Sequence, residues 1–180
     1  LTAHENKHPA GDLGARRYLA RSAGFLLAHC AQAREAIAET YGVARERIAV
    51  SRLGNFIDSY PNEAGRGESR HRLGIPEDRF VFLHLGSLRP YKGVEDLLDS
   101  FHRLRHARKH LLVAGGSPDP AYLEQLRGRA SARGVQFESR FVPPAELQFF
   151  FNAADAVVLP FKDVLTSASL VLAMGFGRMV

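Results

Sequence analysis

Phe80–Gly93 has the sequence FVFLHLGSLRPYKG, and this stretch decides the fold. It opens with an apolar run, Phe80–Leu85, rich in the aromatic, aliphatic and β-branched residues that suit a strand buried on both faces. The run stops at Gly86, a loop with Arg89 and Lys92 follows, and a helical pattern then begins. Backbone N–H groups, a helix N-terminus and two cations together suit a bound phosphate. The stretch therefore predicts a strand, a phosphate-binding turn and a helix.

After this strand, strand and helix patterns alternate to the end of the chain. The further predicted strands are Leu111–Ala114, Val135–Phe141 and Ala156–Leu159. The predicted helices are Val94–Ala107, Ala121–Arg133, Pro144–Asn152 and Ser167–Phe176. Such alternation is typical of a parallel, doubly wound sheet with right-handed crossovers. We therefore expect an α/β fold, with a Rossmann-like C-terminal domain at residues 67–180.

A second α/β block precedes that domain. Its predicted elements are a helix at 13–23, a strand at 25–28, a helix at 31–41 and a strand at 48–50. Residues 53–66 are rich in Gly, Asn, Asp, Pro and Ser, which predicts a linker, and a short helix is expected at Ser69–Leu73. We expect residues 1–52 to be part of another Rossmann-like domain, and the chain to be a fragment cut at both ends.

The composition of the 180 residues, 46% hydrophobic and 24% charged, argues against disorder. The net charge of +5 is compatible with anionic partners. The basic residues are spread along the chain without stacked aromatic side chains beside them, so nucleic acid is the least favoured partner. The single Cys30 cannot form an internal disulfide, which favours a reducing, cytoplasmic compartment. No apolar run is long enough to span a membrane.

Small residues and prolines follow each strand of the predicted C-terminal sheet. The four carboxyl ends read Gly86-Ser87, Gly115-Gly116-Ser117, Phe141-Val142-Pro143 and Pro160-Phe161. Turns of α/β proteins need Gly and Pro whatever they bind, so one such turn indicates little. In an open parallel sheet, however, ligands bind outside the carboxyl ends of the strands. The four turns together with Arg89 and Lys92 therefore predict an anionic ligand such as a nucleotide.

Other motifs are weaker. His4–His8 matches the H-E-x-x-H pattern of zinc proteases, but Pro9 pushes His8 away from helical geometry, so no metal site is predicted. Gly175-Phe176-Gly177 lacks the third glycine of a dinucleotide fingerprint, and no P-loop sequence occurs. Thr166–Ser169 precedes an apolar helix, where these residues serve either as helix caps or as a phosphate site.

Five segments, in this order, resemble the family-4 glycosyltransferases, retaining nucleotide-sugar enzymes of two facing Rossmann domains (the GT-B fold). The segments are Arg52–Asp58, Gly86–Gly93, Leu112–Gly116, Ala153–Pro160 and Leu172–Val180. The similarity covers nearly the whole chain. It implies transfer of a hexosyl group from a nucleotide-diphosphate sugar to a glycan or lipid-linked acceptor.

The resemblance also implies roles for single residues. Lys92 would bind the donor diphosphate, while Gly86, Gly116 and Val142 would line the nucleotide crevice. Ser167, Ala168 and Ser169, next to Thr166, would offer backbone N–H groups to phosphate. His4 matches a histidine that faces the donor sugar. No cofactor and no metal are required, because Arg89, Lys92 and the helix terminus can offset the charge of the leaving group.

The chain departs from the family pattern at two places. Ser87 stands where the family has an arginine, so Arg89 would have to reach the phosphate instead. The two carboxylates of the family's E-x7-E pair are replaced by Val164 and Leu172. Thr166–Leu170 resembles a T-S-x-S-L variant found in some bacterial polysaccharide enzymes.

The sequence therefore predicts a cytoplasmic glycosyltransferase of polysaccharide biosynthesis, and it leaves open a peripheral contact with the inner membrane through basic helices. A non-catalytic nucleotide- or sugar-binding module is the alternative. The fragment itself is expected to bind nucleotide weakly and to catalyse no transfer.

Overall fold

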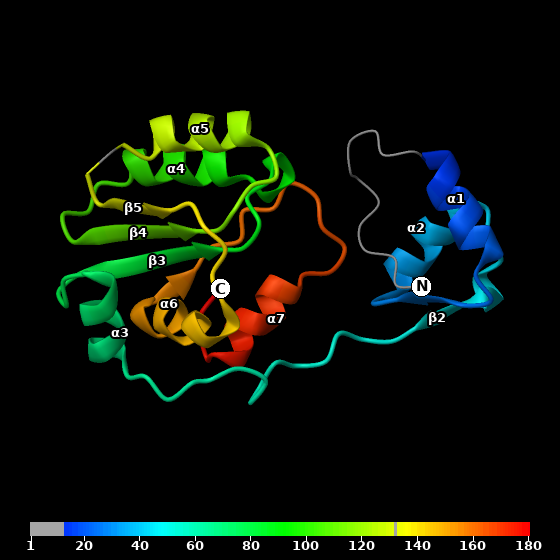
Figure 1. The fold of residues 1–180 in the computed structure, drawn as a ribbon, viewed down its shortest axis with the longest axis horizontal. Coiled ribbons are helices and arrows are strands. Elements are labelled where there is room, and N and C mark those ends of the chain that lie inside the picture. Colours follow the sequence, from blue (N-terminus) through cyan, green and yellow to red (C-terminus); the bar gives the residue numbers. More distant parts are fainter. Residues whose placement is uncertain (1–12, 132) are drawn as a thin grey trace. The chain divides into compact units, whose positions relative to one another are not determined.

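The computed structural model describes residues 13–131 and 133–180 (Figure 1). The chain divides into two compact units, one with the residues up to Gly54 and Val164–Ala168, the other with Asn55–Asp163 and Ser169–Val180. Each unit is a group of residues that contact one another more than they contact the other unit. The domain limits 1–52, 53–66 and 67–180 stay predictions.

In the first unit a short parallel sheet is packed against helices. Its elements are α1 (Leu13–Ser22), β1 (Leu26–Ala28), α2 (Ala31–Tyr41), a 3-10 turn (Arg45–Arg47) and β2 (Ile48–Val50). Leu26 pairs with Ile48, and both side chains lie in the apolar core with Ile37 of α2. The Sγ of Cys30 accepts a hydrogen bond from the Ala33 N–H at 3.3 Å, which caps the start of α2. The helix ends at Tyr41, as predicted, and the left-handed Gly42 caps it by donating its N–H to the Ala38 carbonyl.

The second unit contains a parallel sheet with the strand order β5-β4-β3-β6. The strands are β3 (Phe80–Leu85), β4 (Lys109–Ala114), β5 (Val135–Glu138) and β6 (Ala156–Val157). The apolar run at 80–85 lies between two neighbours, because Leu83 pairs with both Leu112 of β4 and Val157 of β6. The predicted α/β fold with parallel strands is thus confirmed.

Helices cover both faces of this sheet (Figure 1). They are α3 (Arg66–Leu73), α4 (Val94–Arg103), α5 (Pro120–Arg129), α6 (Leu147–Ala153) and α7 (Ala168–Gly175). Side chains of β3 alternate between the faces: Val81 and Leu83 pack with α6 and α7, whereas Phe82 packs with α4 and α5. Within the described ranges, none of the helices has the length and apolarity that crossing a membrane requires.

Several predicted element ends were wrong. Helix α4 stops at Arg103, not at Ala107, because the Lys109 ammonium donates to the backbone carbonyls of Phe101 and Leu104 and satisfies the end of the helix. Helix α3 begins at Arg66, not at Ser69, whose hydroxyl donates to the Gly65 carbonyl at 2.8 Å. Strand β6 has only two residues.

Candidate functional site

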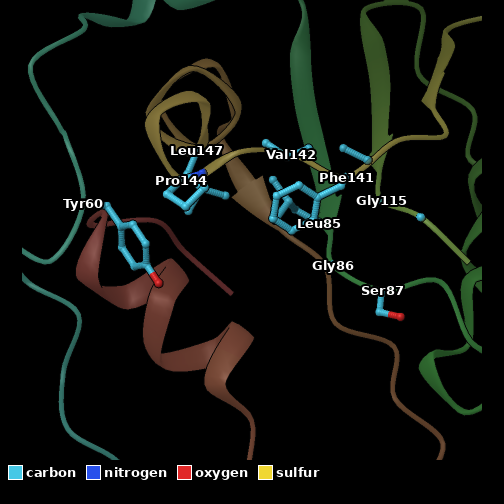
Figure 2. A pocket seen from close by; sticks show the side chains of 11 residues that line it. Tyr60, Leu85, Gly86, Ser87, Gly115, Phe141, Val142, Pro144 and Leu147 are labelled. Carbon is cyan, nitrogen blue, oxygen red and sulfur yellow. The ribbon is translucent and has the colours of Figure 1, made fainter.

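A cavity of about 400 Å³ opens at the carboxyl ends of β3, β4 and β5 (Figure 2). Four residues that the sequence singled out line it: Gly86, Ser87, Gly116 and Val142. Its other lining residues are Tyr60, Leu85, Ala114, Gly115, Phe141, Pro144 and Leu147. The lining is mostly apolar, with bare backbone between the side chains. This is the place where an open parallel sheet binds ligands.

The floor of the cavity is glycine backbone. Gly86 and Gly115 have φ angles of 148° and 155°, which side-chain-bearing residues rarely adopt. A Cβ atom built on Gly115 would lie 1.8 Å from the Gly86 carbonyl oxygen. The two strand ends therefore touch through their backbones, and a ligand can approach the peptide groups directly.

Phe141 forms an exposed wall of the same cavity. Its side chain is 76% exposed, an unusual state for a phenylalanine. The backbone N of Phe141 lies 3.9 Å from the position of a Cβ on Gly116, so the backbone at Phe141 is next to the glycine turn after β4. Val142, the next residue, is buried. Together they give a planar ligand an apolar face and nearby backbone groups.

The two predicted cations lie on the loop that leaves Ser87. The Nε of Arg89 donates to the Ser87 hydroxyl at 3.3 Å. The Nζ of Lys92 is 3.9 Å from the ring centroid of Phe161, so its ammonium rests on an aromatic face. Neither Arg89 nor Lys92 lines the cavity, although both follow directly after one of its walls.

The start of α7 lies beside the end of β3. The Ser169 hydroxyl is 3.8 Å from the position of a Cβ on Gly86. Thr166, Ser167 and Ala168 belong to the first unit. His4 lies outside the described residues, so its predicted role stays a prediction.

Of the two residues that replace the family's carboxylate pair, Leu172 belongs to the apolar core and Val164 does not. Leu172 packs against the apolar cluster around Val81 and Leu83. Val164 is more exposed, and it belongs to the first unit. Within 13–131 and 133–180, no three His, Cys, Asp or Glu side chains gather as metal ligands would.

A buried histidine lies two residues before Gly86. The Nδ1–H of His84 donates to the Val158 carbonyl at 3.0 Å, which leaves Nε2 as the buried acceptor, and this atom has no hydrogen-bond partner among the described residues. The pKa of His84 is lowered from 6.5 to about 4, chiefly by burial; the Val158 carbonyl opposes this shift, and the nearby Lys92 charge adds to it. The imidazole is therefore neutral at pH 7.

We expect the free energy of unfolding to fall as the pH falls from 6.5 towards 4. In this window the unfolded chain binds a proton at His84 that the folded chain does not, which costs about 3 kcal/mol of stability in total. Denaturant unfolding at a series of pH values measures it. The His84→Leu variant should lose this slope, and the exposed-site variant His71→Gln should keep it. Equal slopes in wild type and His84→Leu would contradict the assignment.

A family model described as glycosyl transferases group 1 matches residues 65–174. The chain belongs to this family. The family resemblance seen in the sequence is thus confirmed, and the matched residues include the whole cavity wall from Leu85 to Leu147. They also include the loop with Arg89 and Lys92.

Relatives in the glycosyl transferases group 1 family are longer than this chain. A D-inositol 3-phosphate glycosyltransferase of Streptosporangium roseum is 28% identical over 174 residues, covering 89% of this chain and 39% of the relative. One of Corynebacterium glutamicum is 32% identical over 130 residues, covering 67% of this chain and 31% of the relative. The chain therefore spans well under half the length of these relatives.

Solved glycosyltransferases share the fold. The structure of Anabaena HepE in complex with UDP-glucose has a TM-score of 0.78 at 22% identity, covering 92% of this chain and 46% of HepE. The structure of WaaG, a glycosyltransferase involved in lipopolysaccharide biosynthesis, has a TM-score of 0.70 at 21% identity, covering 85% of this chain and 42% of WaaG. The α/β fold thus matches GT-B glycosyltransferase structures over about half their length.

The site residues assigned from the sequence left out three prominent residues of the cavity. Gly115 and Phe141 stand in turns that the sequence placed at the ends of strands, but neither was assigned a role in the site. Phe141 was also predicted to be the last residue of a strand that in fact ends at Glu138. Tyr60 lies in the segment predicted as a linker, and nothing local indicated that this segment folds back onto the cavity.

Proposed function

We propose that this chain contains the donor-binding part of a glycosyltransferase and that its cavity binds the nucleotide of a nucleotide-diphosphate sugar. One observation carries the proposal. The chain belongs to the glycosyl transferases group 1 family, and its cavity, which has glycine backbone as its floor, lies at the carboxyl ends of three parallel strands. This is the position at which parallel α/β folds bind nucleotides.

The lining suggests how a nucleotide would lie. The base fits against the exposed Phe141 ring, where stacking contributes roughly 1–3 kcal/mol, with backbone groups near Val142 as hydrogen-bond partners. The diphosphate then points towards Gly86, the start of α7 at Ser169, and the cations that follow Ser87. This division separates an apolar half of the site from an electropositive half.

In the transfer itself, negative charge builds up on the departing diphosphate. Arg89, Lys92 and the N–H groups at the start of α7 are suited to offset that charge without a metal ion. We assign the donor-sugar side to His4, and to the backbone of Ser167 and Ala168 a second set of phosphate contacts beside Thr166. A hexosyl group and retention of configuration remain part of this proposal.

The acceptor is proposed as a glycan or a lipid-linked glycan, used in polysaccharide biosynthesis on the cytoplasmic side of the inner membrane. UDP is the first nucleotide to test, because the similar Anabaena HepE was solved with UDP-glucose. The relatives are named D-inositol 3-phosphate glycosyltransferases, but this chain spans only 39% of the first of them, so we do not carry their acceptor over.

Calorimetric titration of the 180-residue chain with UDP, ADP, GDP and pyrophosphate tests the proposal. We expect one nucleoside diphosphate to bind more tightly than pyrophosphate. Lys92→Ala should weaken it about tenfold to a hundredfold, since a hydrogen bond to a charged group contributes about 1.5–3 kcal/mol. Lys162→Ala, which removes an exposed ammonium paired with Asp96 at 3.3 Å, is the matched control and should bind normally. Absence of nucleoside diphosphate binding would refute the proposal.

A non-catalytic nucleotide- or sugar-binding module is the second candidate. The observation that favours it is the replacement of two carboxylates by Val164 and Leu172. The discriminating experiment follows UDP release from UDP-sugars by the longest natural form of the protein. Nucleotide binding without transfer to any acceptor would favour the module.

A further inference from the structure

A strongly basic loop lies at the opposite end of the sheet from the cavity. Residues 102–110, HRLRHARKH, run from the last turn of α4 through the connecting loop to the start of β4, and they contain four Lys or Arg, three His and no acidic residue. The loop lies where β3 and β4 begin, at the left edge of the sheet in Figure 1. The nucleotide cavity lies at the other end of these strands. Both ends can therefore be occupied at once.

The loop is held in place by its neighbours. The Phe80 N–H donates to the Arg108 carbonyl at 2.7 Å, and the Arg79 guanidinium donates to the Ala107 carbonyl at 2.9 Å. The Lys109 ammonium is turned inward to the end of α4. With its backbone fixed in this way, the loop presents Arg103, Arg105 and Arg108 to solvent without a large ordering cost.

Two further arginines extend the charge. Arg79 directly precedes β3. Arg133 directly precedes Gly134, and Gly134 lies next to the end of the loop, because a Cβ built on it would lie 3.2 Å from the Lys109 carbonyl oxygen. We call Arg79, Arg103, Arg105, Arg108 and Arg133, with Phe80 and Leu104, the basic edge.

Few carboxylates offset the basic edge. Asp78 pairs with Arg79 at 3.6 Å, and Asp99 is taken up by Arg129 at 2.8 Å. In the part of the chain that the structure describes, no carboxylate pairs with Arg103, Arg105, Arg108 or Arg133. The edge therefore keeps a net positive charge, because Arg79 alone among its five arginines pairs with a carboxylate of the described residues.

Apolar side chains emerge among these arginines. Leu104 is 42% exposed and Phe80 is 40% exposed. Phe80 is the outer end of an aromatic row, with ring centroids 4.9 Å from Phe82 and, from there, 6.4 Å to Phe101 of α4. The row is anchored in the core, so its outer end is presented rigidly.

We propose that the basic edge docks the protein on the surface of an anionic phospholipid membrane. Clustered arginines are attracted to acidic headgroups, and half-exposed apolar side chains between them gain free energy by entering the headgroup–acyl boundary. An aliphatic side chain such as Leu104 cannot stack on a base, and the Phe80 ring is in contact with the Phe82 ring at a tilt of 52°. The membrane therefore fits the edge better than a nucleic acid.

Sedimentation with phosphatidylcholine vesicles, with and without about one third phosphatidylglycerol, tests the proposal on the 180-residue chain. We expect binding to the acidic vesicles only, and weaker binding as salt rises. The triple variant Arg103→Gln, Arg105→Gln, Arg108→Gln should reduce the partition more than about tenfold. Arg17→Gln, Arg52→Gln, Arg127→Gln removes the same charge from exposed sites elsewhere and should reduce it much less. Leu104→Asp should also weaken binding.

Three results would overturn the proposal: no binding to acidic vesicles at low salt, equal losses in the two triple variants, or tighter binding to duplex DNA than to vesicles at equal phosphate concentration. The last would indicate a nucleic-acid surface. Circular dichroism and unchanged nucleotide titrations of the variants separate a lost docking surface from a lost fold. The proposed nucleotide site does not enter this test, so either proposal can fail alone.

Discussion

Replacing Asp155 with alanine is expected to lower the free energy of unfolding by about 3–5 kcal/mol. Arg70 is fully buried, and its guanidinium donates to Asp155 at 2.8 Å and to the carbonyls of Ala153, Glu77 and Arg79. The same carboxylate accepts the Val81 N–H at 2.7 Å. Its removal leaves a buried cation without a counter-charge and a strand N–H without an acceptor. Denaturant unfolding measures the loss.

The matched control is Arg66→Ala. Arg66 also pairs with Asp155, at 3.0 Å, but its side chain is 52% exposed, so its loss should cost less than about 1 kcal/mol. The double variant Arg70→Met, Asp155→Leu should recover much of the stability, since no charge is then buried. A cost for Asp155→Ala no larger than that for Arg66→Ala would show that the pair does not anchor α3 to the sheet.

Gly115→Ala is expected to destabilise the protein by about 3 kcal/mol or more and to abolish nucleotide binding, since a steric clash adds to backbone strain. The new methyl group would lie 1.8 Å from the Gly86 carbonyl oxygen, which is backbone and cannot turn away. Either the turn after β4 or the turn after β3 must move, and both form the floor of the cavity. Thermal unfolding and the nucleotide titration measure the two effects.

Gly128→Ala is the control for the same chemical change. Gly128 lies in α5 with open space where its Cβ would be, so the substitution should raise stability by up to about 1 kcal/mol and leave binding unchanged. If Gly115→Ala also folds with wild-type stability and binds nucleotide, the close packing of the two strand ends is wrong.

The sequence predicted best what is encoded locally. The apolar run at 80–85 defines a buried strand without help from other segments, and glycine or serine after a strand identified Gly86, Ser87 and Gly116 as cavity residues. These features depend on hydrophobic pattern and turn chemistry within a few residues.

What the sequence did not predict depends on contacts between distant segments. Arg70 and Asp155 are 85 residues apart, and neither stands out in its own segment. The Tyr60 segment belongs to the second unit because Gln148 accepts the N–H groups of Glu63 and Ala64, and because Asn152 binds Asn62. The end of α4 was missed for a more local reason, since its carbonyls are satisfied by Lys109 at the start of the next strand.

Hydrogen exchange of the chain with and without its tightest nucleoside diphosphate tests the central claim most directly, because it locates the bound ligand. We predict slower amide exchange at residues 85–87, 114–116 and 141–147, which contain most of the cavity lining, and unchanged exchange at residues 102–110, which contain most of the basic edge. Protection confined to other segments, with the cavity residues exchanging as in the free chain, would contradict the account.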